Sequence, residues 1–210
     1  MDLARHIHTP WDPSADPGLE YTHKAVETLK TINSVDCAGH VRLRDINSGL
    51  LADNRFTTWP GATKKHHAYP GGLVVHTMQV WTTVEAMLLT TDYPKHQMCE
   101  AFTACLWHDC GKIWDFEPEP IGSHAVNLAH RDLIRHVARS YAEFMHVARM
   151  QCGGVSEQEM DRIGHAILAH HGRKEWGSPV EPRTTLAWCV HTADMFSAHY
   201  TMNGGDGVPA

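Results

Sequence analysis

The spacing of apolar residues constrains the fold of this 210-residue chain more than any other feature. Apolar residues recur at intervals of about three or four positions over long segments, a pattern typical of helices that bury one face. No stretch shows the sustained alternation of apolar and polar residues that indicates a half-buried strand. We therefore expect an all-α protein, with helices over the ranges 20–32, 41–56, 73–90, 97–110, 124–150, 156–171 and 184–202.

The length suits one main domain with short extensions, and it is sufficient to bury a sizeable core. Three prolines, Pro10, Pro13 and Pro17, predict an irregular arm at the start of the chain. We divide the chain into an N-terminal arm and helical extension (1–55), a main helical domain (56–202) and a flexible tail (203–210).

Several helix boundaries carry recognisable signals. Ser156 followed by Glu159 forms a capping-box pattern at the start of one helix. Gly172 and Gly111 each follow an apolar helical run and predict its end. The prolines and glycine of segment 116–122 predict a loop.

Composition excludes several classes of protein. The net charge of −6 disfavours a protein that coats nucleic acid, although a site for one phosphate group is compatible with it. There is neither an apolar run of about 18 residues nor an apolar N-terminal segment, so we expect a cytoplasmic protein without a membrane span. The six cysteines lie mostly in apolar helical patterns and form no C-x-x-C pair, so we expect buried thiols and no disulfide framework.

Histidine is unusually frequent, with 18 in the chain. Neutral imidazole and carboxylate groups bind divalent metals, and a helical bundle can gather such groups from separate helices into one pocket. Adjacent residues on a helix point about 100° apart, so His108 and Asp109 either serve two metals or share one at an opened helix end. The candidates near predicted helix ends are His76, His108, Asp109, His130, His136, His170, His171 and Asp194.

The residues alone leave two choices open. His130 and His136 are six positions apart, about 240° round a helix, so both cannot face one pocket. His170 and His171 are neighbours, and either can be the ligand. His191 lies three positions before Asp194 and shares its helix face, so we expect its ring to orient that carboxylate.

The order His76, His108-Asp109 and Asp194 resembles the HD-domain superfamily of metal-dependent phosphohydrolases, which has an all-helical bundle fold. The further histidines resemble its dinuclear members, which follow the order H…HD…H…H…D. The bacterial 3′→5′ exoribonuclease branch is closely similar over about residues 55–200, in the segments KKHHAYPGGLVVHT, LWHDCGK, LIRHV, LAHHGRKEWGSPVEP and HTADM. That branch normally carries an OB domain before the HD domain, but the first 55 residues here are too short for one and read as helical.

The resemblance implies two divalent metal ions, with iron or manganese preferred and magnesium, nickel or cobalt as further candidates. It favours His136 over His130, because His136 matches the family's LxxH pattern, and we prefer His170 to His171. Asp109 is expected to bridge the two metals, since a carboxylate has two oxygens. The implied ligands are His76, His108, Asp109, His136, His170 and Asp194.

Basic residues and histidines near these ligands are candidates for contact with phosphate. Lys112 either binds phosphate as a point charge or offsets the dipole at a helix C-terminus. His66 and His67, preceded by Lys64 and Lys65, would supply phosphate contacts or a proton to the leaving group. We therefore expect Asp109, Lys112 and His67 to act in catalysis, and His66, His171 and Arg173, next to Lys174, to bind substrate.

The predicted function is hydrolysis of a phosphoester in a nucleotide or short oligonucleotide, by a water that two metals activate. The expected partner is thus a phosphorylated small molecule or a short nucleic acid. Two other classes remain open: a di-iron HD-type oxygenase that cleaves a C–C or C–P bond, and a non-catalytic nucleotide-sensing domain. Imidazole and carboxylate ligands suit several metals, so the ligand set does not separate the first of these from a hydrolase.

Overall fold

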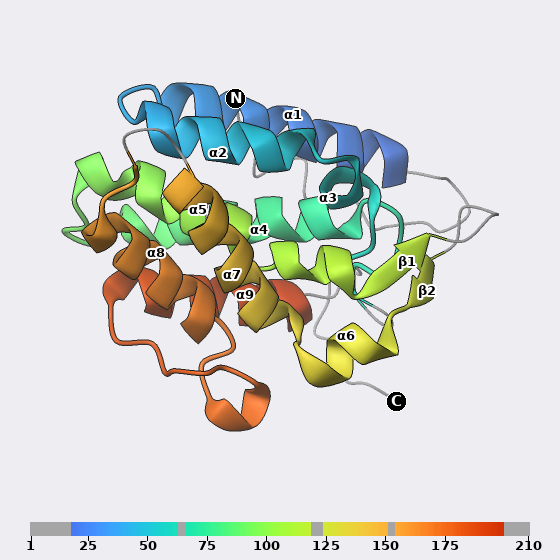
Figure 1. The fold of residues 1–210 in the computed structure, drawn as a ribbon. Coiled ribbons are helices and arrows are strands. Elements are labelled where there is room, and N and C mark those ends of the chain that lie inside the picture. Colours follow the sequence, from blue (N-terminus) through green and yellow to red (C-terminus); the bar gives the residue numbers. More distant parts are fainter. Residues whose placement is uncertain (1–17, 63–65, 119–123, 151–153, 200–210) are drawn as a thin grey trace.

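The computed structural model describes residues 18–62, 66–118, 124–150 and 154–199, and its fold confirms the all-α prediction (Figure 1). None of the helices in these ranges is both long and apolar enough to cross a bilayer. The α-helices are α1 (Gly18–Asp36), α2 (Val41–Ala52), α3 (Asn54–Thr58), α4 (Gly72–Leu88), α5 (Met98–Trp107), α6 (Leu128–Leu133), α7 (His136–Met150), α8 (Glu157–Ala169) and α9 (Thr185–His199). Short elements complete the fold: the 3₁₀ turns η2 (Lys95–Gln97), η3 (Cys110–Trp114) and η4 (Lys174–Trp176), and the strands β1 (Phe116–Pro118) and β2 (His124–Val126).

Helices α4 and α5 form the centre of the molecule. Helices α1 and α2 lie on one side of them, and α7, α8 and α9 lie on the other (Figure 1). Trp81 of α4 and Phe102 of α5 are fully buried and meet edge to face, with ring centroids 5.2 Å apart. Leu29 and Leu43, from the expected N-terminal extension, belong to the same hydrophobic core. The boundary near residue 55 stays a sequence-based prediction.

The predicted capping box at the start of α8 is confirmed. The Ser156 hydroxyl accepts a hydrogen bond from the backbone N–H of Glu159, and the Glu159 carboxylate accepts one from the backbone N–H of Ser156. The same carboxylate lies 2.5 Å from Nε2 of His40 and so ties α8 to the start of α2. Burial opposes ionisation of Glu159, but the bonds from Ser156 and His40 lower its pKa to about 2.

The prediction of one continuous helix over 124–150 is wrong. The segment instead contains β2, which pairs with β1 in antiparallel register, then α6 and α7. Asn127 caps α6 by accepting a hydrogen bond from the backbone N–H of His130. Arg135 adopts a positive φ of 67°, which ends the helical path before α7 begins. The apolar spacing continues across this break, so periodicity alone did not reveal it. The expected loop over 116–122 begins instead as β1, and residues 119–123 lie outside the described part of the chain.

Gly111 plays a different part from the predicted helix stop. Helix α5 ends at Trp107, and Gly111 lies within η3. A Cβ at this position would overlap the carbonyl oxygen of His136, and the Gly111 backbone N–H donates to Oγ of Ser140 at 2.8 Å. Glycine is therefore needed here because the backbones of η3 and α7 approach closely.

The prediction that the cysteines are all thiols is wrong for one pair. Cys37, directly after α1, forms a disulfide with Cys99 of α5. The two cysteines are 62 positions apart, so only the packing of α1 against α5 brings them together. Cys105, Cys110 and Cys189 are buried free thiols, as expected, and Cys152 lies outside the described residues.

Replacing Cys37 with serine should destabilise the protein, because the cross-link no longer restricts the unfolded chain. For a closed loop of this length the loss is up to about 4 kcal/mol in the free energy of unfolding. Urea denaturation followed by circular dichroism measures it.

Treatment of the wild-type protein with dithiothreitol should reproduce most of this loss, whereas the stability of the Cys37→Ser variant should not respond to the reductant. Equal stability of the wild type with and without dithiothreitol would show that the cross-link contributes nothing.

Candidate metal centre

His108 and Asp109 lie where α5 ends, and the backbone there explains how neighbours reach one pocket. His108 keeps helical dihedral angles, whereas Asp109 has φ −116° and ψ 7° and has left the helix. Both side chains are almost fully buried. The expectation of an opened helix end therefore agrees with the structure, and the two side chains converge although they are adjacent.

One cluster joins His76 near the start of α4, His108 and Asp109 at the end of α5, and Asp194 in the interior of α9. His76 Nε2 lies 3.2 Å from Oδ2 of Asp109, 3.2 Å from Oδ1 of Asp194 and 3.2 Å from Nε2 of His108. His108 Nε2 lies 3.4 Å from the same Oδ2 of Asp109. The four ligand atoms all lie within 4.8 Å of one another, as they would around one metal ion.

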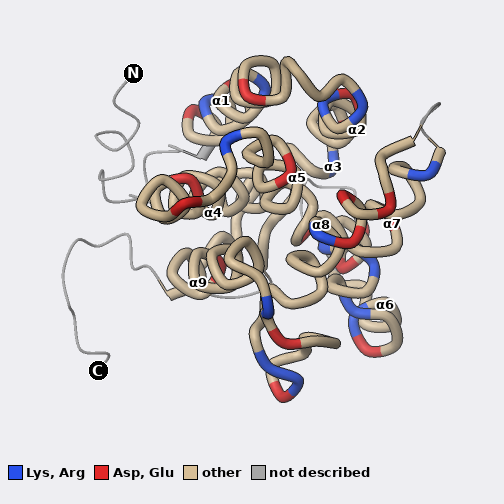
Figure 2. The backbone as a smooth tube through the Cα atoms, turned by 90° about the vertical axis from the view of Figure 1, so that its left-hand side faces the viewer, with Lys and Arg blue, Asp and Glu red and all other residues tan. Residues whose placement is uncertain are grey.

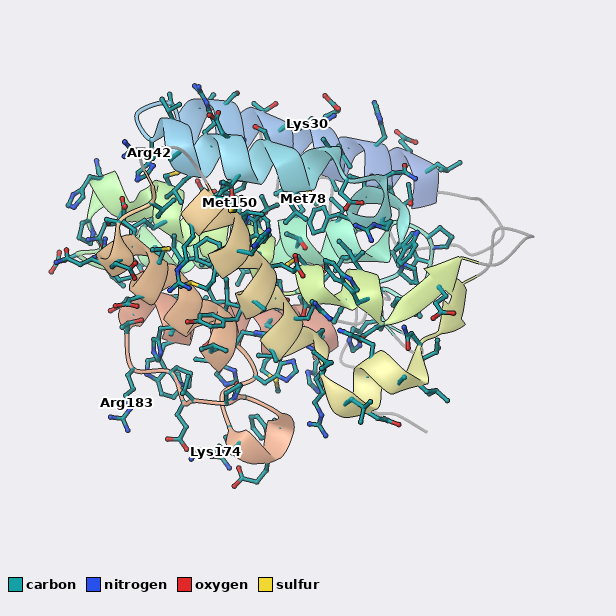
Figure 3. All side chains as sticks on the ribbon, viewed as in Figure 1. Lys30, Arg42, Met78, Met150, Lys174 and Arg183 are labelled. Atoms are coloured by element: carbon teal, nitrogen blue, oxygen red, sulfur yellow. A yellow bond between two sulfur atoms is a disulfide. The ribbon has the colours of Figure 1, made fainter. Side chains whose placement is uncertain are left out.

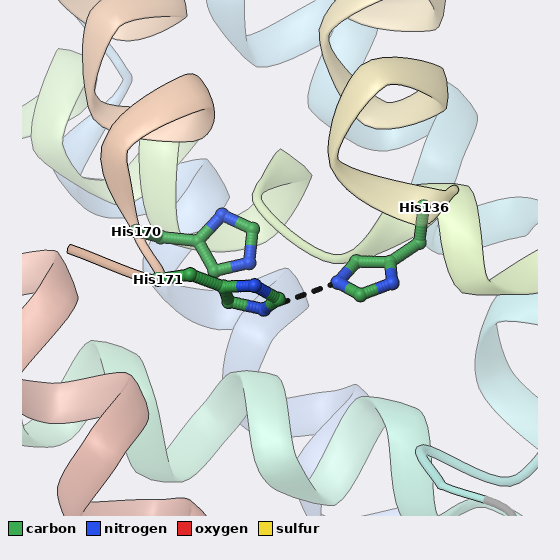
Figure 4. Close-up of side chains that lie close together, drawn as sticks. All are labelled: His136, His170 and His171. Atoms are coloured by element: carbon green, nitrogen blue, oxygen red, sulfur yellow. Dashed lines mark hydrogen bonds between the residues drawn. The ribbon is translucent and has the colours of Figure 1, made fainter. Parts of the chain in front are cut away.

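A second cluster contains His136, His170 and His171 (Figure 4). His136 Nε2 is 3.2 Å from Nε2 of His171, and the rings of His170 and His171 are 4.3 Å apart. The other oxygen of Asp109, Oδ1, lies 3.4 Å from Nε2 of His136 and 3.6 Å from Nε2 of His170. The two oxygens of Asp109 thus face different clusters, which is the arrangement that a bridging ligand requires.

Hydrogen bonds on the far side of each ring orient the imidazoles. Nδ1 of His108 donates to the carbonyl of Cys105 at 2.7 Å, and Nδ1 of His170 donates to that of Ile167 at 2.6 Å. His171 does the same with the carbonyl of Trp176 at 2.8 Å. A proton held at Nδ1 leaves Nε2 free to coordinate a metal, and such outer contacts fix the ring position.

Consecutive hydrogen bonds between side chains orient the ring of His76. Its Nδ1 lies 2.9 Å from Oγ of Ser197 on α9, and that hydroxyl donates to Oε1 of Gln79 at 2.8 Å. The Ser197 oxygen therefore accepts the proton of His76. Sequence analysis missed both residues, because a serine and a glutamine far apart in the chain carry no signal of such a role.

His136 and His170 of the second cluster are neutral. Burial lowers the pKa of His136 to about 3, and it holds the pKa of His170 well below its ordinary value. A neutral imidazole offers a lone pair, whereas a protonated one cannot bind a metal. These two groups are therefore in the state that coordination needs.

The carboxylates remain ionised in spite of burial. Burial alone would raise the pKa of Asp109, but the charge of Lys112 and the contact with His108 hold it well below its ordinary value. Nζ of Lys112 is ion-paired with Oδ2 at 2.5 Å, whereas Oδ1 has no hydrogen-bond partner in the described part of the chain. Nε2 of His170 is likewise buried without a hydrogen-bond partner among the described residues. Buried polar atoms are rarely left in this state, so these atoms fit a bound divalent metal.

Lys112 follows the cluster directly and lines an adjoining cavity of about 430 Å³. Burial opposes its charge, but the carboxylates of Asp109 and Asp194 raise the pKa of Lys112, so the ammonium stays protonated. His136 and His171 line the same cavity. The predicted phosphate-binding lysine thus stands where a substrate in this cavity would meet it.

His66 and His67, the histidine pair before α4, differ in their exposure and contacts. His67 is buried and has φ 55°. Its Nε2 donates a hydrogen bond to Oε1 of Gln79 at 3.0 Å. Burial lowers the pKa of His67 to about 2, so its ring is neutral and cannot act as a cationic proton donor. His66 is partly exposed, and burial lowers its pKa as well. Lys64 and Lys65 lie outside the described residues.

Other candidates lie at the edge of the centre. Arg173 stacks its guanidinium over Trp176, 5.0 Å from the ring centroid, and Lys174 projects from the loop below α8 (Figure 3). His130 belongs to neither cluster, because its Nδ1 contacts Oδ1 of Asp115 at 2.8 Å. His191 differs from the expectation, since its Nδ1 donates to the carbonyl of His170.

Gly172, which the sequence marked as a helix stop, has φ 82°, and the ring of His191 fills the space that its Cβ would occupy. A glycine here therefore serves two purposes: it adopts a left-handed conformation after α8 and lets α9 pack closely.

The HD domain family model matches residues 73–199. Similar proteins include the 3′-5′ exoribonuclease YhaM of Geobacillus sp. (strain WCH70), 28% identical over 150 residues that cover 71% of this chain and 44% of the relative. The enzyme of the same name from Bacillus subtilis (strain 168) is 28% identical over 148 residues, covering 70% of this chain and 45% of the relative. The chain thus spans less than half the length of these relatives. No solved structure matches it significantly.

Addition of Mn²⁺ or Fe²⁺ should stabilise the protein, because the buried Oδ1 of Asp109 and the buried Nε2 of His170 then coordinate a cation. At a metal concentration of 100 times Kd the gain is about 2.7 kcal/mol, which raises Tm by about 5–10 °C in a chain of this size. Thermal denaturation of EDTA-treated protein with and without metal measures this shift. The Asp109→Asn variant should lose most of it, and Asp161→Asn, an exposed control on α8, should keep it; an equal shift in both variants would contradict the assignment.

Removal of the hydroxyl that orients His76 should weaken metal binding without removing a ligand. We expect Ser197→Ala to bind Mn²⁺ about 10–100 times more weakly than the wild type, because the His76 ring loses its fixed tautomer and position. Calorimetric titration with Mn²⁺ gives the affinity. Ser34→Ala, an exposed serine on α1, serves as control, and unchanged affinity in Ser197→Ala would rule out this orienting role.

Proposed function

This chain belongs to the HD domain family, and we propose that it is a metal-dependent phosphohydrolase that hydrolyses a phosphoester of a nucleotide or short oligonucleotide. The proposal includes two divalent metals. One would be held by His76, His108, Asp109 and Asp194, and the other by Asp109 with His136 and His170, His171 lying beside them.

The single observation that carries this proposal is the position of the Asp109 carboxylate. Its Oδ2 faces the cluster of His76 and His108, and its Oδ1 faces His136 and His170. A carboxylate that is buried, ionised and shared between two sets of imidazoles is suited to hold two cations close together. Lys112 is ion-paired with Oδ2, but Oδ1 faces the nitrogen atoms of His136 and His170 and has no hydrogen-bond partner among the described residues, which suits a bound cation.

Two bound divalent ions supply an activated water and neutralise the charge that develops during in-line displacement at phosphorus. Two side chains of the protein would act together with these ions. Asp109 fixes the relative position of the two clusters, and Lys112 presents a permanent positive charge at the wall of the cavity. That ammonium would bind a non-bridging phosphate oxygen as a point charge.

We assign the histidine pair before α4 to different tasks. His66, which is partly exposed, is the member that can contact substrate, whereas His67 is buried, neutral and bonded to Gln79. We therefore propose that His67 positions Gln79 and Ser197 behind His76 and does not donate a proton itself. Arg173 stays a candidate for binding substrate at the rim, where its guanidinium already rests on Trp176.

The relatives support a nucleic acid or nucleotide as substrate, since they bear the name of 3′-5′ exoribonucleases. A short substrate suits the cavity, because about 430 Å³ lies in the range of small-molecule sites. Mn²⁺ and Fe²⁺ are the metals to test first, since a set of imidazoles and carboxylates accepts both.

The protein loaded with Mn²⁺ should release a mononucleotide from a dinucleotide such as ApA. Asp109→Asn should lower kcat/KM by at least about a thousandfold, because both metal clusters lose the shared carboxylate. Elemental analysis should find two metal ions per chain in the wild type and about one in His136→Gln. Asp161→Asn is the control for loss of one carboxylate.

The same protein preparations distinguish phosphoester hydrolysis from the alternative functions. Full activity of Asp109→Asn would refute the assignment of the centre. Oxygen consumption by iron-loaded protein, without cleavage of any phosphoester, would instead indicate an oxygenase. Nucleotide binding with two metals but no turnover of either kind would indicate a sensing domain.

A further inference from the structure

The lining of the cavity beside the metal centre includes basic residues that the proposed chemistry does not use. Lys112, His136 and His171, which belong to or adjoin the clusters, line this cavity. Residues of α6, of the break before α7 and of the end of η4 line it as well, and Arg131 and Arg135 are among them. Figure 2 shows basic positions next to acidic ones on α6 and on the segment after α8, whereas α4 and α5 carry few charges.

The two arginines differ from the other charged groups of the cavity. Lys112 is paired with Asp109, and Asp115 is hydrogen-bonded to His130. Within the described parts of the chain, neither Arg131 nor Arg135 has a carboxylate oxygen within 4.0 Å, although Asp132 also lines the wall and Arg131 acts electrostatically on Asp115. Their guanidinium groups are therefore free to bind an anion, and guanidinium matches the geometry of phosphate oxygens.

The backbone of Arg135 supplies an independent indication. Its φ of 67° is a conformation that glycine adopts without strain, and a long side chain there costs conformational free energy. Among the described non-glycine residues only His67 shares a positive φ, and it also adjoins the centre. A strained residue that retains a long cationic side chain at a cavity is best explained by a task of that side chain.

The side chain of Arg135 ends close to Gly177 and His171, which line the same cavity. Its Nη1 lies 3.4 Å from the place where a Cβ of Gly177 would stand, and Nδ1 of His171 lies 3.5 Å from the same point. The guanidinium thus ends beside a ring of the second cluster. The lining of the same cavity also includes Leu128 and Trp176, which are 65% and 48% exposed. A cavity that offers two arginines in addition to Lys112, together with exposed apolar groups, fits a nucleoside that carries two phosphates.

We propose that Arg131 and Arg135 form a second phosphate subsite, so that the preferred ligand carries a second phosphate one nucleoside away from the phosphate at the metal centre. The ligand class is a nucleoside 3′,5′-bisphosphate or the equivalent unit of a 5′-phosphorylated dinucleotide. The identity of the first phosphate as the reacting group rests on the proposed function, but binding of the second phosphate does not.

Equilibrium binding tests the subsite directly. Calorimetry with Mn²⁺-loaded protein compares adenosine 3′,5′-bisphosphate with adenosine 3′-monophosphate and 5′-monophosphate. The wild type should bind the bisphosphate at least about tenfold more tightly than either monophosphate, because a charge-assisted bidentate contact contributes that much or more. Arg135→Gly should lose most of this preference while binding of the more tightly bound monophosphate stays within about twofold.

The choice of glycine separates a binding role from a structural one. Arg135→Gly relieves the left-handed backbone, so its Tm should be equal to that of the wild type or higher by up to about 4 °C. Arg131→Gln provides a second variant at a backbone position without a positive φ, and it should reduce the same preference. Arg149→Gln, which removes the same charge from the far end of α7, should leave both affinities unchanged.

Kinetics extends the test to turnover. If the proposed function holds, the wild type should cleave pApA with a higher kcat/KM than ApA, and Arg135→Gly should reduce this ratio toward one. Absence of cleavage of both dinucleotides would refute the proposed function, while the ratio of binding constants would still decide the subsite. Bisphosphate and monophosphate affinities within twofold of each other in the wild type would overturn the subsite, as would an equal loss of both in Arg135→Gly.

Discussion

A single ionised carboxylate, that of Asp109, is the group on which the arrangement of the helix ends depends. It is 1% exposed and lies among nitrogen atoms of His76, His108, His136 and His170. Removal of a carboxylate from water costs several kcal/mol unless opposite charges and ligands surround it. Residues from α4 and α7 and from the ends of α5 and α8 therefore surround this carboxylate. The ammonium of Lys112 supplies a positive charge beside it.

The helix ends meet at this centre only because the backbone departs from regular helical geometry beside it (Figure 1). Asp109 leaves the helical conformation directly after α5, and Gly111 allows η3 to approach the start of α7. Gly172 turns the chain sharply after α8 so that the ring of His191 can pack against it. These departures lie close to the centre, as expected where a site requires side chains to meet that regular helices would separate.

Much of this organisation could be predicted from local patterns. Apolar spacing predicted the main helices, and Ser156 with Glu159 predicted the start of α8, because both signals act between residues a few positions apart. The predicted separation of His130 and His136 by about 240° does not apply, because the two lie on different helices, but the structure does bring only His136 of this pair into a cluster. The break at Arg135 was missed, since apolar periodicity continues across a single residue that changes the sign of φ.

The sequence by itself determined the helical class, the residue types able to bind metal and their placement near helix ends, because these follow from local spacing and side-chain chemistry. Only the tertiary structure decided which oxygen of Asp109 faces which histidines, that Ser197 stands behind His76, and that Cys37 pairs with Cys99. It also brought Arg131 and Arg135 into the lining of the cavity that Lys112 borders. These relations join residues far apart in the chain, so they depend on how α1, α4, α5, α7 and α9 pack, and no local pattern encodes that packing.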